Sequence, residues 1–326
     1  MRGAVVAEGL SREFAVLRRA GVLRRRRTVV RAAQDITFAI QPGEMVGYIG
    51  PNGAGKSTTV KMLTGILYPT SGRAQVAGLD PARERVALAR RIGVVFGQRR
   101  QLWWDLPLRD SFQILRHLYR IPADRHRRNL DAFVELLELG PFLETPVRQL
   151  SLGQVMRGEL TAALLHDPEV VFLDEPTIGL DVESKARALD FLVALNRERG
   201  TTVLMTTHDL ADLERICPRM LIIDQGRLIF DGAVAEIRRF GSERTLVVDL
   251  EAPLPPLRVT GAEDVRVAGR RQWIRFRRDR VSAAAVIAEV AAAAPVVDLA
   301  VEETPIEEIV RRIYRDGIDQ VQLESA

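Results

Sequence analysis

The sequence has little of what marks secreted, membrane-spanning or nucleic-acid-binding proteins. Its 326 residues include one cysteine, Cys217, so no disulfide can form within the chain, and this favours a reducing compartment. No window reaches the ~20 mostly apolar residues of a membrane span, and residues 281–297, the nearest, are interrupted by Glu289 and Pro295. Residues 1–14 contain no apolar core of a signal peptide. The formal charge of +4 is too small an excess to indicate nucleic acid, so none is expected as a partner.

What the sequence does have is a regular alternation of apolar runs and helical patterns over residues 4–231. Several runs are apolar almost throughout, as in strands that are covered on both faces. We expect strands at 36–40, 45–49, 94–96, 170–173, 202–205 and 220–223. Helical spacing follows the third strand, at 111–119, 129–139 and 154–165. This pattern predicts an α/β core with a helical insertion at about 99–166.

The pattern changes near residues 240 and 241, where we place a domain boundary. Beyond it we expect strands at 245–250, 265–267, 273–276 and 296–301, and helices at 281–292 and 306–314. Three prolines within 252–257 indicate a linker or an edge loop. The fold class expected is therefore an α/β domain over 1–240 with a small α+β domain over 241–326.

The strongest motif is a glycine-rich run that follows the expected strand 45–49. It reads Gly50, Pro51, Asn52, Gly53, Ala54, Gly55, Lys56, Ser57 and Thr58, and contains the G-x-x-x-x-G-K-S pattern of a phosphate loop. Its backbone N–H groups and the following helix N-terminus can bind phosphate. Lys56 is expected to reach the β- and γ-phosphates, and the Ser57 hydroxyl is expected to bind Mg²⁺. A glycine-rich turn without a ligand is the alternative, and it leaves the flanking strand and helix unexplained.

An acidic pair ends the expected strand 170–173. Asp174 can reach the metal at the carboxyl edge of a parallel sheet, where Ser57 also lies. Glu175 is the candidate base that polarises the attacking water. Many buried strands end in an acidic residue, so the pair is informative because it accompanies a phosphate loop.

Four further motifs follow in a characteristic order. Residues 150–154 read Leu-Ser-Leu-Gly-Gln, Gln98 follows the strand 94–96, residues 178–181 end in Asp181, and His208 follows the strand 202–205. Together with the phosphate loop and the acidic pair, they resemble the ATP-binding subunits of ABC transporters: the signature motif, the Q-loop, the D-loop and the switch histidine. The resemblance covers about residues 4–231. It implies a P-loop ABC ATPase core with a helical subdomain.

The resemblance also implies roles for these residues. Two copies would stack head to tail, with ATP between the phosphate loop of one copy and the signature residues Ser151, Gly153 and Gln154 of the other. Glu175, His208 and Gln98 would act in hydrolysis, Gln98 would join Ser57 and Asp174 on Mg²⁺, and Asp181 would lie at the nucleotide. A homodimer is expected, because the chain carries both halves of the composite site.

Taken singly, some of these residues have ordinary alternatives. Gln98 could be a surface glutamine, and His208 could cap the helix expected at 209–217. Ser151 is expected to be a helix N-cap in either case, which suits contact with a γ-phosphate. Their joint order in one chain is what makes the ordinary alternatives improbable.

Three features depart from the family pattern. Leu152 stands where the signature most often has glycine, and it would be strained if that position required a positive φ. Gly97 is an extra residue before Gln98. The aromatic residue expected to stack on adenine is ambiguous, and Phe14 is our candidate.

Two other segments, residues 18–27 and the tryptophan pair, can each be interpreted in two ways. Residues 18–27 include six arginines, which indicate either a solvated hairpin or loop or a contact with anionic lipid headgroups. Trp103 and Trp104 lie where the family contacts the membrane subunit, and they could form such an interface or pack inside the helical insertion. The segment from 241 resembles, more weakly, the C-terminal domain of some drug- and polysaccharide-exporting ABC ATPases.

The sequence thus predicts an ATPase subunit at the cytoplasmic face of the cell membrane. It would power a separate transmembrane permease through ATP-driven dimerisation, with export favoured over import. The alternative is a soluble ABC ATPase acting on DNA or ribosomes, although such proteins usually carry two motor domains or a long coiled coil.

Overall fold

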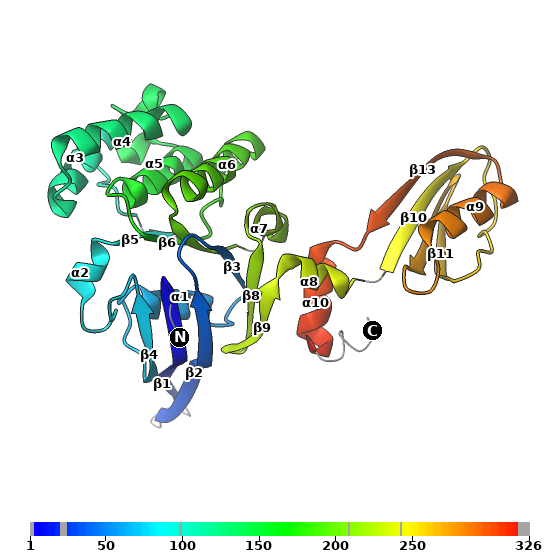
Figure 1. The fold of residues 1–326 in the computed structure, drawn as a ribbon, viewed down its shortest axis with the longest axis horizontal. Coiled ribbons are helices and arrows are strands. Elements are labelled where there is room, and N and C mark those ends of the chain that lie inside the picture. Colours follow the sequence, from blue (N-terminus) through cyan, green and yellow to red (C-terminus); the bar gives the residue numbers. More distant parts are fainter. Residues whose placement is uncertain (1–2, 20–24, 98–99, 208, 242, 319–326) are drawn as a thin grey trace. The chain divides into compact units, whose positions relative to one another are not determined.

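The computed structural model describes residues 3–19, 25–97, 100–207, 209–241 and 243–318, with the side chains of 17–19 and 25–27 left out. The chain divides into two compact units, residues 1–232 and 233–326 (Figure 1). Gln98 and His208 lie outside the described residues. The domain boundary at 240 and 241 remains a prediction.

A six-stranded sheet forms the centre of the first unit. Its order is β5 (Ile92–Phe96), β6 (Val170–Asp174), β7 (Thr202–Thr206), β3 (Met45–Ile49), β8 (Arg219–Asp224) and β9 (Arg227–Ala233). The pairs from β5 to β8 are parallel. Every residue of β3 and β7 is buried, which explains why these strands read as unbroken apolar runs. Five predicted strands and the α/β class are thereby confirmed.

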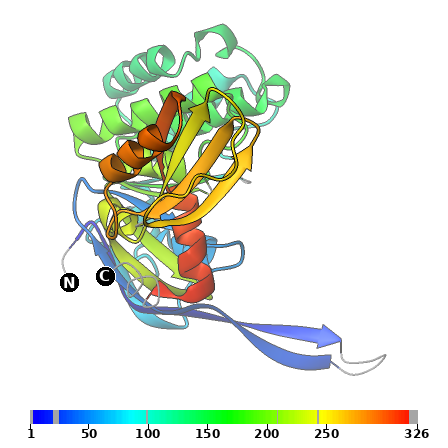
Figure 2. The ribbon, with the colours of Figure 1, turned by 90° about the vertical axis from the view of Figure 1, so that its right-hand side faces the viewer.

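A second sheet has the order β2 (Arg25–Ile40), β1 (Val5–Arg19) and β4 (Ser71–Val76). The predicted strand 36–40 is the end of β2. β1 and β2 pair from Val5 and Ile40 out to Arg19 and Arg25, whereas β4 pairs with β1 only as far as Ser11. The outer half of the pair is therefore a two-stranded ribbon, drawn in blue in Figure 2. The described arginines of the segment 18–27, namely Arg18, Arg19, Arg25, Arg26 and Arg27, belong to this outer half.

Helix α1 (Lys56–Leu63) joins the two sheets. Its Val60, Met62 and Leu63 belong to one buried core with Phe38 of β2 and Phe172 of β6. The phosphate loop that precedes α1 is thus anchored by side chains from both sheets. The remaining helices of the core are α2 (Arg85–Ala89), α6 (Val182–Arg199) and α7 (Leu210–Ile216).

The predicted helical insertion consists of α3 (Leu108–Tyr119), α4 (Ala123–Leu136) and α5 (Leu152–Leu164), with single 3-10 turns at Gly140–Phe142 and Val147–Gln149. All three predicted helices are present, but their ends differ. α4 begins after Pro122 and ends three residues early, because Glu138 adopts a left-handed φ of 49° that a helix cannot continue. α5 begins two residues early because Ser151 caps it.

The second unit begins with α8 (Val234–Arg239) and contains an antiparallel sheet. Its order is β11 (Ala262–Ala268), β12 (Arg271–Arg277), β10 (Glu243–Leu250) and β13 (Val296–Glu303). Helix α9 (Ala283–Ala293) packs its Val286 and Val290 into a core with Leu246 and Phe276. The predicted strands and helices of this region are thus present.

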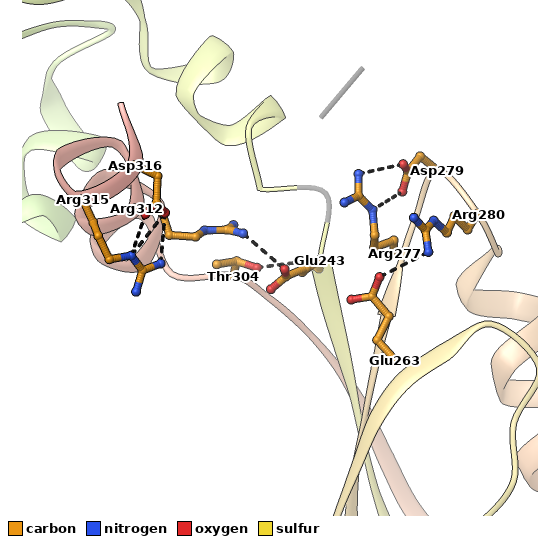
Figure 3. A network of polar contacts seen from close by, with 9 residues as sticks. All are labelled: Glu243, Glu263, Arg277, Asp279, Arg280, Thr304, Arg312, Arg315 and Asp316. Carbon is orange, nitrogen blue, oxygen red and sulfur yellow. Dashed lines mark hydrogen bonds and ion pairs between the residues drawn. The ribbon is translucent and has the colours of Figure 1, made fainter. Parts of the chain in front are cut away.

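Two polar contacts hold irregular segments of the second unit in place. Buried Gln272 donates to the carbonyls of Leu254 and Pro255 and accepts from the N–H of Leu257, so it satisfies the proline-rich loop. Just before α10 (Ile306–Asp316), the Thr304 hydroxyl donates to the carbonyl oxygen of Glu243 at 2.9 Å (Figure 3). A backbone that lacks strand or helix partners is stabilised by such side-chain bonds.

Candidate nucleotide-binding site

The phosphate loop connects the end of β3 to the start of α1, and its backbone requires glycine. Gly53 and Gly55 have φ values of 84° and 106°, which L side chains rarely adopt. A Cβ on Gly55 would lie 2.1 Å from the carbonyl oxygen of Ala32, and one on Gly50 would lie 2.4 Å from that of Ile223. The motif glycines therefore fit a tight loop that crosses neighbouring backbone.

Lys56 is held at the mouth of this loop. Its Nζ donates to the carbonyl oxygens of Gly50 at 2.5 Å and Pro51 at 3.2 Å. Burial lowers the pKa of Lys56, and the nearby charges of Glu175 and Asp174 oppose that shift. The loop thus aims an ammonium group at the space enclosed by its own backbone.

The ends of β6 and β7 bring Asp174 to Ser57. The Ser57 hydroxyl donates to Asp174 Oδ2 at 3.2 Å, and the Thr206 hydroxyl donates to Asp174 Oδ1. Because Asp174 and Thr206 are register partners in parallel strands, both side chains reach the same sheet edge. Thr206 was not among the predicted site residues. Its position directly after the apolar run 202–205 is the sequence feature that could have indicated it.

Glu175 leaves the strand direction immediately after Asp174. Its φ is 55°, a left-handed conformation that costs a non-glycine residue roughly 1–2 kcal/mol. Its N–H donates to the carbonyl of Thr206 at 2.9 Å, which holds the turn. Backbone strain of this kind is concentrated at functional sites.

These residues line one open cleft of about 390 Å³. Eight predicted site residues line it, namely Asn52, Gly53, Gly55, Lys56, Ser57, Thr58, Asp174 and Glu175. Ala32, Lys61, Phe96, Gly97 and Ile178 also line it and were not predicted as site residues. Lys61 lies four residues after Ser57 on α1, a spacing that puts both on one helix face and could have identified it. Ala32 lies on β2 of the second sheet, and its carbonyl oxygen lies close to Gly55 of the phosphate loop.

Phe14 is not among the described residues that line the cleft. It lies on β1 opposite Val30, and the guanidinium carbon of Arg12 lies 4.8 Å from its ring centre. Its contact with adenine therefore stays a prediction. The roles of Gln98 and His208 stay predictions as well, although Gly97, which precedes Gln98 in the chain, lines the cleft.

The signature segment forms the start of α5. Ser151 accepts from the N–H of Gln154 at 3.2 Å, and the Gln154 side chain accepts from the N–H of Ser151 at 2.9 Å. This reciprocal capping box confirms that Ser151 is an N-cap. Neither residue lines the described cleft, and neither does Gly153.

Leu152 fits its position without backbone strain. It is the first residue of α5, and among the described residues it is not one of those with positive φ. Its side chain lies over Gly179, since a Cβ on Gly179 would be 2.1 Å from Leu152 Cδ2. Gly179 has φ of 74°, and Asp181 then caps α6 by accepting from the N–H of Ser184 at 2.9 Å. The signature and D-loop segments thus contact each other through Leu152.

Comparison with known proteins identifies the family. Residues 33–178 match the family described as ABC transporter. The daunorubicin resistance ATP-binding protein DrrA3 of Streptomyces coeruleorubidus is 37% identical over 223 residues, which cover 68% of this chain and 70% of that protein. The chain belongs to the ABC transporter family.

Two further matches agree. The Nod factor export ATP-binding protein I of Burkholderia pseudomallei strain 1710b is 39% identical over 199 residues, covering 61% of this chain and 64% of that protein. A solved structure of the ATP binding subunit of an ABC transporter matches with a TM-score of 0.63 and 26% identity, covering 72% of this chain and 92% of the other. The resemblance read from the motifs is thus confirmed, and the chain is an ATP-binding subunit and ATPase of the ABC family.

The ABC subunit exposes its tryptophan pair. Trp103 is 37% exposed and Trp104 is 50% exposed, so these side chains do not pack inside the helical insertion. The guanidinium carbon of Arg100 lies 4.4 Å from the Trp104 ring centre. In the described part of the chain, no helix is long and apolar enough to cross a membrane.

Proposed function

We propose that this protein is the ATP-hydrolysing subunit of a transporter and powers a separate membrane permease through ATP-driven dimerisation. The proposal rests on the observation that the motif residues lie at two separate places in one copy of the chain. Lys56, Ser57, Asp174 and Glu175 line one cleft, while Ser151 lies at the start of α5 outside that lining. A second copy that supplies its own Ser151 would complete the site.

The cleft suits phosphoryl transfer to water. ATP is the substrate: Lys56 and the loop N–H groups would bind its β- and γ-phosphates. Ser57 Oγ and Asp174 Oδ2, 3.2 Å apart, are oxygen ligands of the kind that Mg²⁺ prefers, and the ion would neutralise phosphate charge there. Water attacks the γ-phosphorus, its proton passes to the Glu175 carboxylate, and the bond to ADP breaks. We assign Gln98 and His208 to orienting the water and the γ-phosphate.

Dimerisation follows from the position of the signature residues. The capped start of α5 directs N–H groups and a partial positive charge outward, which suits a γ-phosphate bound by another copy. Loss of the γ-phosphate removes these contacts, so the two copies separate. Asp181 lies next to the same surface because Leu152 contacts the D-loop.

Three observations support a permease partner and export. Relatives are named for drug resistance and for Nod factor export, and exposed Trp103 and Trp104 suit an interface with a membrane subunit. We place the protein at the cytoplasmic face of the membrane, bound through the permease. Co-purification with a multi-span membrane protein supports this proposal, whereas recovery with ribosomes or DNA favours the alternative.

A mixing experiment tests the composite site. Lys56→Ala disables the cleft, and Ser151→Asp places a negative charge against the γ-phosphate while keeping an N-cap side chain. Each variant alone is expected to lack ATPase activity. Mixed together, they form heterodimers with one intact site, so activity returns.

The matched control mixes Lys56→Ala with the double variant Lys56→Ala and Ser151→Asp, which leaves no intact site and no activity. If the first mixture also stays inactive although heterodimers form, Ser151 does not serve the cleft of a second copy.

A further inference from the structure

A buried carboxylate links the signature helix to the tryptophan loop, residues 101–107. Glu159 lies on α5, eight residues beyond Ser151, and is only 4% exposed. Its two oxygens accept from the N–H of Gln101 at 2.9 and 3.0 Å, and Oε1 also accepts from the N–H of Leu102 at 3.3 Å. Burial raises the pKa of Glu159, and these N–H donors oppose that shift. Because a buried carboxylate needs its hydrogen-bond donors, Glu159 holds the backbone of Gln101 and Leu102 in place.

Gln101 also contacts the core. Its side-chain Nε2 donates to the carbonyl of Val94 on β5 at 2.5 Å, while its backbone N–H is bonded to Glu159. One residue therefore joins the six-stranded sheet to the helical insertion. This is where a pivot between the two would lie.

Close packing reinforces the bond on the α5 side. A Cβ on Gly158 would lie 2.8 Å from Leu108 Cδ1 and 3.0 Å from Leu102 Cδ1, so α5 approaches the loop more closely than any larger residue would allow. Leu102 and Leu108 are buried. The loop and this turn of α5 thus form one packed unit.

The other side of the loop is bonded to the segment that leads into the signature. The N–H of Arg148 donates to the carbonyl of Trp104 at 2.9 Å, and the N–H of Val147 donates to that of Leu106 at 3.0 Å. The tryptophan loop is therefore attached both before and after Ser151. The start of α5 cannot be displaced without displacing the loop or breaking these bonds.

We propose that Glu159 is a positioning residue that couples the start of α5 to Trp103 and Trp104. It acts through the backbone of Gln101 and Leu102 and does not touch the nucleotide. When ATP is bound between two copies, contact with Ser151 displaces α5, and the tryptophan pair moves with it about the Gln101–Val94 contact. This role rests on the proposed function, because it needs a nucleotide-dependent contact at Ser151.

Tryptophan fluorescence tests this coupling in the full chain. The chain has three tryptophans, so Trp273→Phe leaves only the pair at 103 and 104. With Glu175→Gln to retain ATP, addition of Mg²⁺ and ATP is expected to shift the emission of the pair. Glu159→Ala should abolish the shift, while affinity for a fluorescent ATP analogue stays within twofold. Glu135→Ala, an exposed carboxylate on α4, is the control and should keep the full shift.

Glu159→Gln keeps one carbonyl oxygen but sets an amide group against a backbone N–H, so it should reduce the shift in part. This variant decides the matter if Glu159→Ala does not fold. A full shift in every folded Glu159 variant overturns the proposal, as does a parent that binds ATP without any shift. A parent that fails to bind ATP contradicts the proposed function instead.

Discussion

The cleft and the signature segment are both rich in motif residues, but they are built differently. In the cleft, Ser57 and Asp174 are 117 residues apart in the chain and bond directly, and Thr206 holds the same carboxylate. At the start of α5, Ser151 and Gln154 bond to each other across one helical turn. The cleft is thus assembled by tertiary structure within one copy. The signature is a local structure that is complete as a helix start and, in our proposal, serves another copy.

The largest effect is expected at the cleft, from Glu175→Gln. Loss of the general base should lower kcat by about 10²–10⁴-fold while ATP still binds, because Lys56 and Ser57 are untouched. Phosphate release and size-exclusion chromatography with ATP measure turnover and dimer accumulation. Glu198→Gln, at an exposed site on α6, is the matched control. Unchanged ATP hydrolysis in the Glu175→Gln variant would show that Glu175 is not the general base.

Ser151→Asp tests whether the two regions serve different copies. Turnover should fall at least tenfold, because a carboxylate would repel the γ-phosphate of the second copy by a few kcal/mol in a low-dielectric interface (~4 kcal/mol at 4 Å). Binding of an ATP analogue to dilute protein should stay within twofold, and the melting temperature should hold, because Asp also caps helices. Weakened binding to the dilute monomer would place Ser151 in the cleft of its own copy.

Gly179→Ala tests the contact that joins the signature to the D-loop. The left-handed φ costs alanine about 1–2 kcal/mol, and the new Cβ would clash with Leu152, so both thermal stability and turnover should fall. Adding Leu152→Ala removes the clashing atoms and should recover part of the loss. Thermal melting and ATPase rates of the four proteins in this cycle measure the coupling. Strictly additive effects would show that the two positions act separately.

The smallest effect is expected from Phe14→Ala. If Phe14 stacks on adenine, loss of ~1 kcal/mol of stacking should weaken ATP binding about fivefold. Fluorescence titration with an ATP analogue measures the change, and Val16→Ala on the same strand is the control. Unchanged affinity would indicate that another residue holds the base.

The sheet and the cleft differ in how well the sequence predicts them. Runs such as 45–49 and 202–205 predicted buried strands, because parallel strands covered on both faces are apolar throughout. β4 was not predicted, since its residues Ser71–Val76 are mostly exposed and carry no apolar run. In the cleft, Lys56, Ser57, Asp174 and Glu175 were predicted from motifs. Ala32, which lines the cleft from β2, and Thr206, which bonds Asp174 from β7, were not, because contacts between segments far apart in the chain bring them there.

The backbone strain expected at Leu152 is another case in which the sequence could not predict the local structure. The sequence marks the departure from glycine, but only the structure shows that this position is an ordinary first helical residue and that its side chain covers Gly179. Likewise, the sequence does not distinguish a buried from an exposed Trp103 and Trp104. Their exposure is seen only in the folded helical insertion.

By itself, the sequence determined the chemistry and the family, because phosphate binding and helix capping depend on residues that are close together in the chain. Lys56 follows its loop directly, and Ser151 is three residues from Gln154. Tertiary structure alone decided which distant residues meet: Thr206 on Asp174, Leu152 over Gly179, and Glu159 on the backbone of Gln101. Such contacts are set by strand register and helix packing, which no local pattern encodes.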